Sequence, residues 1–175
     1  DPLVAISLIE AIYEKIIIID PVNQPYYYQN MEDYIHEIID LHDALETLIE
    51  THDWHGETLY FAGHNALGLF AERYHFTIIS IYTDFKPEQD TLSSEIIRFM
   101  DQIKASQATH LMVEELIEPL VANQIKSSLA REGYTIELLE LHAYHNVSKI
   151  DFDAGVRYAD LFQRNIHHIE IALRG

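Results

Sequence analysis

One stretch of sequence decides the fold class of this 175-residue chain: Thr58-Leu-Tyr-Phe-Ala-Gly-His-Asn-Ala-Leu-Gly-Leu-Phe-Ala-Glu-Arg-Tyr-His-Phe-Thr-Ile-Ile-Ser-Ile-Tyr82. It begins with a short β-rich run at 58–62 and ends with another at 76–82. Between them, residues 65–74 have the apolar spacing of one face of a helix. Two strands joined by a crossover helix run parallel, so the stretch predicts a β-α-β unit.

The same alternation continues to the end of the chain. Further β-rich runs lie at 111–113 and 136–141, and helical patterns lie at 91–105, 119–131 and 152–173. Strands that alternate with helices through short connections favour a parallel sheet with helices on both faces. The sequence therefore predicts an α/β lobe over residues 54–175, built on a four-stranded parallel sheet flanked by helices.

Residues 1–53 have a different character. They contain no glycine, which favours long helices, and a first helix is expected at 3–19, where Asp20-Pro21 ends it. A second helix follows Pro25 and runs to about residue 51, because its apolar residues recur at steps of three and four. We therefore expect a helical linker and a long backbone helix over 1–53 to precede the α/β lobe.

The composition excludes several classes of function. The chain carries 29 Asp and Glu against 11 Lys and Arg, a net charge of −18. Such a surface repels nucleic-acid phosphates and anionic lipids, so binding to either is not expected. The chain has no cysteine, which excludes a thiolate zinc site and a cysteine nucleophile. No run approaches the roughly 20 apolar residues that a membrane-spanning helix needs.

His and Glu side chains follow three of the four predicted strands. His64 comes after the first strand, Glu114 and Glu115 after the third, and His142 and His145 after the fourth. The carboxyl ends of parallel strands open on one edge of the sheet, called here the rim. Imidazoles that meet from separate loops are usual ligands of Zn²⁺, so these histidines predict a metal site. Alternatively, each histidine caps a helix or bonds a backbone carbonyl.

The carboxylates at the rim leave their roles open. Glu114 and Glu115 could bind the metal, could hydrogen-bond an imidazole that does, or could face solvent. The loop after the second strand, at 83–85, adds Asp84. A Gly63–Gly68 spacing resembles a phosphate-binding loop, but the Lys that such a loop requires is absent.

Several segments, taken in order, resemble the zinc/manganese substrate-binding proteins of ABC transporters. Residues 20–34 are similar to the stretch leading into that family's long backbone helix, 61–74 to its strand–His–helix segment, and 155–165 to its closing helix. The resemblance implies two α/β lobes joined by a rigid helix, with the metal held in the cleft. It also implies that this chain is the helix plus the carboxyl-terminal lobe, and that the amino-terminal lobe, with further ligands, is missing.

The resemblance also implies roles for individual residues. His64 matches a metal ligand, and Glu114 matches the acidic residue that closes the third strand and supports the ligands. The family's usual Asp after the last strand is absent. If this sequence is aligned with the family at the end of the last strand, His142 takes the place of that Asp. If residues are instead counted back without gaps from Asn165 in the closing helix, the position falls on Asn146, beside His145. His142 and His145 are therefore alternatives. An imidazole-rich site favours Zn²⁺, with Mn²⁺ as the alternative.

The function implied by the resemblance is binding without catalysis. The protein would be extracytoplasmic, either periplasmic or a cell-surface lipoprotein, and would capture a divalent metal ion for delivery to an ABC permease at the membrane. One alternative is a metal-dependent hydrolase using the same rim, which would need an open coordination position and a general base. Another is a structural protein in which the acidic helices dimerise and the histidines are incidental.

Overall fold

The computed structural model describes residues 1–64, 66–82 and 93–174. The loop at 83–85, with Asp84, lies outside these residues. The chain divides into two compact units, Asp1–Asp53 and Trp54–Gly175. Within the described residues, no helix combines the length and the apolar character needed to cross a membrane.

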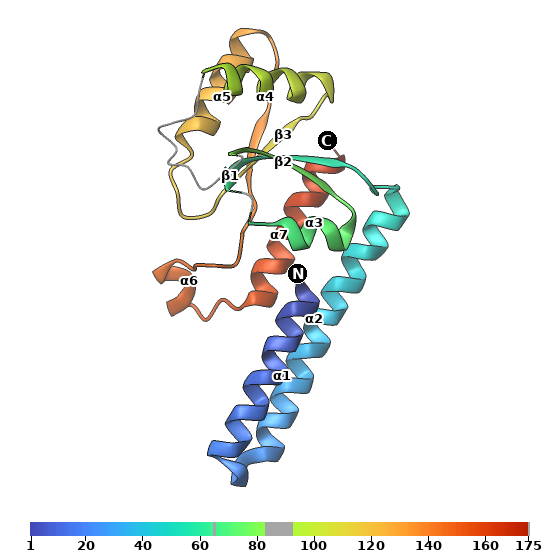
Figure 1. The fold of residues 1–175 in the computed structure, drawn as a ribbon, viewed down its shortest axis with the longest axis vertical. Helices are drawn as coiled ribbons and strands as arrows, with labels where there is room; N and C mark the ends of the chain where they lie inside the picture. The colour runs from blue at the N-terminus through green and yellow to red at the C-terminus, as the bar shows by residue number, and fades with distance from the viewer. Residues whose placement is uncertain (65, 83–92, 175) are drawn as a thin grey trace. The chain divides into compact units, whose positions relative to one another are not determined.

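The first unit is a helical hairpin (Figure 1). Helix α1 spans Pro2–Ile19, a single 3-10 turn spans Pro21–Asn23, and α2 spans Gln24–His52. Asp20 closes the turn, because its carboxylate accepts hydrogen bonds from the Asn23 amide at 2.7 Å and the Tyr27 hydroxyl at 2.8 Å. These two bonds lower the pKa of Asp20. The long helix predicted before the α/β lobe is therefore present as α2.

The second unit contains one parallel sheet, which confirms the predicted fold class. Its strands are β1 (Thr58–His64), β2 (Thr77–Tyr82), β3 (His110–Val113) and β4 (Glu137–Glu140), in the order β2-β1-β3-β4. All three pairings are parallel. The helices of this unit are α3 (Gly68–Tyr74), α4 (Ser93–Ala105), α5 (Leu120–Arg131), α6 (Lys149–Asp153) and α7 (Tyr158–Arg174).

Helices cover both faces of the sheet (Figure 1). Tyr60 and Phe61, adjacent in β1, point to opposite faces, as alternation along a strand requires. Tyr60 joins the core cluster that includes the inner faces of α4 and α5. On the other face, Phe70 of α3 and Phe162 of α7 meet edge to face with ring centroids 6.5 Å apart. The helices thus anchor both sides of the strands that end at the rim.

The prediction of one closing helix over 152–173 is wrong in its first part. Helix α6 ends at Asp153, and the chain turns through Gly155, which has a φ of +75° that is costly for residues with a side chain. Ser148 caps α6 by accepting the Asp151 N–H at 2.9 Å. At the start of α7, the Asp160 carboxylate accepts the N–H of residue 157 at 2.7 Å. Ser148 and Asp160 therefore satisfy backbone N–H groups at the starts of α6 and α7.

The strand order places a switch point between β1 and β3. The chain passes from β1 through α3 to β2 on one side, then crosses back to β3 on the other side of β1. At such a point the helices that follow two adjacent strands leave toward opposite faces, and a crevice opens at the carboxyl ends of the strands. His64 ends β1 and Glu114 follows β3, so both lie at this crevice.

Candidate metal centre

The ring of His64 is held from two sides. Its Nδ1 lies 3.1 Å from Oε2 of Glu114, and the same oxygen accepts the backbone N–H of His64 at 3.3 Å. On its other side the imidazole stacks on Tyr82, with ring centroids 5.2 Å apart and planes 25° apart. A carboxylate at Nδ1 favours the tautomer in which Nδ1 carries the proton and Nε2 carries the lone pair that a metal can use.

Gly63 allows Glu114 to approach this closely. A Cβ at residue 63 would lie 2.6 Å from a ring carbon of Phe61 and 3.0 Å from Cβ of Glu114. The pairing of β1 with β2 also shifts register between Phe61 and His64. Glycine in a strand commonly marks such an irregularity or a close approach of another segment. The residue directly before His64 therefore has a steric reason to lack a side chain.

Glu114 contacts two of the predicted ligands. Its side chain is only 9% exposed, and while Oε2 binds His64, Oε1 lies 3.9 Å from Nε2 of His145. It thus lies between an imidazole from β1 and an imidazole from the loop after β4. The supporting role of Glu114 stays a prediction, and its place between the two imidazoles is the one that such a role requires.

Glu115 lies deeper than Glu114. Its side chain is 2% exposed, and Oε2 accepts the N–H of Ala143 at 3.0 Å. Its other oxygen, Oε1, lies 3.8 Å from Nδ1 of His142 and 3.9 Å from Nδ1 of His145. The two adjacent glutamates thus face different neighbours: Glu114 lies beside His64 and His145, and Glu115 beside His142 and His145.

His142 is buried, and its polar groups are engaged. Its backbone N–H donates to Oδ1 of Asn165 at 2.8 Å, and its carbonyl accepts from Nδ2 of the same amide at 2.8 Å. Its ring Nδ1 accepts the backbone N–H of Tyr144 at 2.9 Å. Because that bond uses the Nδ1 lone pair, the proton of a neutral His142 ring is on Nε2.

Asn165 of α7 also reaches Tyr144. Its Nδ2 donates to the Tyr144 hydroxyl at 2.6 Å. Burial raises the pKa of Tyr144 well above its ordinary value. Tyr144 has a φ of +65°, so the chain reverses here before His145. The role of Asn165 is not among the predictions made from the sequence, although the sequence carries one signal of it. Asn165 falls on the apolar stripe of α7 with Phe162, Ile166 and Ile169, where a buried amide needs a hydrogen-bond partner.

His145 is the exposed member of the group. Its side chain is 57% exposed, and its two ring nitrogens face two different carboxylates, Nε2 toward Glu114 and Nδ1 toward Glu115, both at 3.9 Å. These distances exceed a hydrogen bond, so the ring is near both carboxylates without being fixed by either.

The structure brings all five rim residues, His64, Glu114, Glu115, His142 and His145, into one chain of neighbours. Within the described residues, however, no three of their ligand atoms lie within 4.8 Å of one another. The group that does so is His42, Asp43 and Glu46 on α2, where His42 and Glu46 form an ordinary ion pair one helical turn apart at 3.5 Å. The rim thus offers pairs of ligands rather than a closed cage.

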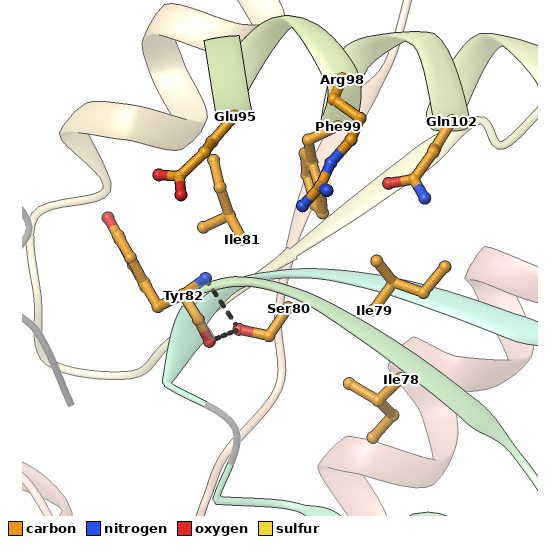
Figure 2. A pocket seen from close by; sticks show the side chains of 9 residues that line it. All are labelled: Ile78, Ile79, Ser80, Ile81, Tyr82, Glu95, Arg98, Phe99 and Gln102. Atoms are coloured by element: carbon orange, nitrogen blue, oxygen red, sulfur yellow. Dashed lines mark hydrogen bonds between the residues drawn. The ribbon is translucent and has the colours of Figure 1, made fainter. Parts of the chain in front are cut away.

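A separate pocket of about 360 Å³ lies between β2 and α4 (Figure 2). Glu95, Arg98 and Gln102 extend from α4 over the strand, and the Ser80 hydroxyl bonds the backbone N–H and carbonyl of Tyr82. None of the five rim residues lines this pocket. It borders the candidate centre through Tyr82, on which His64 stacks, and through Ser80, whose hydroxyl donates to the carbonyl of Gly63.

Comparison with known proteins gives the family. The family described as zinc-uptake complex component A, periplasmic (ZnuA), matches residues 1–172. The chain belongs to this family. A curated relative, the high-affinity zinc uptake system protein ZnuA of Bacillus subtilis, is 23% identical over 172 residues, which are 98% of this chain and 51% of that protein. The family consists of binding components of metal transport and not of enzymes, so the hydrolase alternative has no support.

Solved structures share the fold of this ZnuA-family chain. The metal-dependent lipoprotein YcdH of Bacillus subtilis superposes with a TM-score of 0.78 at 22% identity, over 98% of this chain and 61% of that one. The periplasmic zinc binding protein TroA from Treponema pallidum gives 0.75 at 17% identity, over 94% and 58%. A Mn-bound periplasmic metal binding protein from Candidatus Liberibacter asiaticus gives 0.72 at 20% identity, over 98% and 61%. The chain spans about half the length of its curated relative and about three-fifths of these structures.

Proposed function

We propose that this protein captures a divalent metal ion at the rim and delivers it to an ABC permease at the membrane. The observation that carries the proposal is the pair formed by His64 and Glu114 at the switch point between β1 and β3, with Nδ1 and Oε2 3.1 Å apart. A carboxylate that orients an imidazole in this way is the usual support of a metal-binding histidine. The zinc-uptake family and the zinc-binding and manganese-bound relatives support a metal as the cargo.

His145, rather than His142, is the second ligand in this proposal. Nδ1 of His142 is occupied by the Tyr144 N–H, and binding a metal through Nε2 would require a proton on that same Nδ1. A proton there would oppose the Tyr144 N–H. His145 has no such constraint and lies beside both rim carboxylates.

The preferred cargo in this proposal is Zn²⁺ rather than Mn²⁺. Two imidazoles, from His64 and His145, suit zinc, whereas manganese prefers carboxylate and water oxygen. Zinc binds most nitrogen and oxygen sites more tightly than manganese, whatever the physiological cargo. The ratio of zinc to manganese affinity is therefore compared between the wild type and a variant in which a ligand is replaced.

A further lobe completes the site in this proposal. A closed zinc site takes four ligands, more than the rim histidines supply, and the chain spans only about half of its curated relative. The hairpin of α1 and α2 carries an almost wholly apolar groove of about 260 Å³, lined by residues that include Ile12, Ile16 and Met31. We propose that an amino-terminal lobe of the relatives' kind covers this groove, and that the protein acts outside the cytoplasm, as the periplasmic and lipoprotein relatives do.

Calorimetry with ZnCl₂ tests the ligand assignment. We expect His64→Ala and His145→Ala each to weaken Zn²⁺ binding at least tenfold, about 1.4 kcal/mol. His142→Ala should change zinc affinity less, and His167→Ala, which removes an exposed imidazole of α7 outside the rim, serves as the matched control. Unchanged affinity in His64→Ala would show that the metal does not bind at this rim.

A further inference from the structure

One oxygen of Glu115 lacks a hydrogen bond although it is buried. The side chain is 2% exposed, and no donor among the described residues reaches Oε1. The other oxygen, Oε2, accepts the Ala143 N–H and so fixes the carboxylate in place. A buried carboxylate oxygen without a partner is unfavourable, and it calls for a cation or a donor that arrives from outside.

Neither neighbouring imidazole is placed as that donor. Nδ1 of His142 is 3.8 Å away and already accepts the Tyr144 N–H, so it has no proton to give. Nδ1 of His145 is 3.9 Å away, beyond hydrogen-bond distance. Oε1 of Glu115 therefore faces Nδ1 of His142 and Nδ1 of His145. The lone pair of the first accepts the Tyr144 N–H, so only Nδ1 of His145 can offer a lone pair to a cation.

We infer that Oε1 of Glu115 binds the captured cation directly, together with Nδ1 of His145, an inference that rests on the proposed function. Two ligands of a tetrahedral Zn²⁺ at 2.0–2.1 Å lie about 3.4 Å apart. The 3.9 Å gap between these atoms therefore has to close by only about half an ångström. His145 is exposed enough to make that movement.

The same arrangement gives Glu114 a consistent role. With Nδ1 of His145 on the metal, its Nε2 carries the proton and faces Oε1 of Glu114, 3.9 Å away. Glu114 then holds Nδ1 of His64 at 3.1 Å and is the carboxylate that Nε2 of His145 faces. The adjacent glutamates thus have different roles in this inference: Glu114 supports the imidazole ligands, and Glu115 binds the cation itself.

The test is the isosteric substitution Glu115→Gln, compared with Glu118→Gln, which alters an exposed carboxyl group on the same loop. The Gln carbonyl can still accept the Ala143 N–H, and the amide nitrogen takes the position of the unpartnered oxygen. We expect the metal-free variant to melt at or above the temperature of the wild type. Its Zn²⁺ affinity by calorimetry should fall at least tenfold, and the rise in melting temperature on adding ZnCl₂ should shrink accordingly. Glu118→Gln should change neither.

The outcomes separate this inference from the proposed function. Wild-type zinc affinity in Glu115→Gln, alongside a loss in His64→Ala, would overturn the inference and leave the proposed function intact. No zinc binding by the wild type would remove the proposed function and the inference with it. A Glu115→Gln protein that melts lower or fails to fold would also overturn the inference, because both oxygens would then be needed by the fold.

Discussion

Replacing Asn165 by Ala should cost more stability than its size suggests. The side chain is 1% exposed and makes three hydrogen bonds, with the N–H and carbonyl of His142 and with the Tyr144 hydroxyl. Each buried polar group left without a partner costs about 1–3 kcal/mol. Losing the amide deprives three such groups at once, so we expect a loss of about 3–5 kcal/mol, against about 5–15 kcal/mol for a typical domain.

Urea unfolding followed by the fluorescence of Trp54 measures this loss. Trp54 is the only tryptophan, is buried and belongs to the second unit, so it reports on the fold that contains Asn165. The control is Asn123→Ala, which makes the same change at an exposed position of α5 and should stay within about 0.5 kcal/mol of the wild type. If Asn165→Ala costs less than about 1 kcal/mol, the hydrogen bonds of this amide to His142 and Tyr144 are not what holds the loop after β4.

Three further predictions test the packing behind the rim. Gly63→Ala should destabilise the protein by about 1–3 kcal/mol in urea titrations because its Cβ meets atoms at 2.6 and 3.0 Å, whereas Gly68→Ala, with open space around it, should be neutral or mildly stabilising. Burial lowers the pKa of His110 below its ordinary value of 6.5, so the unfolded chain binds a proton first as pH falls. The unfolding free energy should therefore decrease as pH drops through about 6.5, and His110→Asn should reduce that slope in melts at pH 5.5 and 7.5. Phe162→Ala, at a fully buried ring, should cost about 3–5 kcal/mol, while Phe152→Ala, at a ring 70% exposed, should stay near wild type in the same assay.

The strands and helices could be predicted because their patterns are long and regular. The alternation along β1 puts Tyr60 and Phe61 on opposite faces, and both faces are covered, so apolar residues are required throughout the run. The break between α6 and α7 could not be predicted with the same security. A glycine within a helical pattern, such as Gly155, can either stay in the helix at a cost in stability or form a turn. Only the φ of +75° that Gly155 has in the fold decides for the turn.

The location of the candidate site could be predicted, but its internal geometry could not. Parallel strands end on one edge, which brings His64, Glu114 and His145 near one another whatever the details of the loops. The pairing of carboxylates with imidazoles depends on where each side chain points. These residues lie beyond the ends of the strands, where side chains no longer alternate strictly between the two faces of the sheet. The choice between His142 and His145 could not be made from the sequence either, because it depends on the hydrogen bond from the Tyr144 N–H to Nδ1 of His142.

The proposed ligands differ in how firmly the fold holds them, and this difference bears on release of the ion. His64 is fixed by Glu114 and by stacking on Tyr82, and Glu115 is fixed by the Ala143 N–H. His145 is 57% exposed, and its nearest carboxylate oxygens are 3.9 Å away. A protein that delivers its cargo must lose its ligands in some order, and the ligand with the fewest buried contacts moves at the lowest cost. Release should therefore begin at His145, while the strand-anchored groups keep their positions for the next ion.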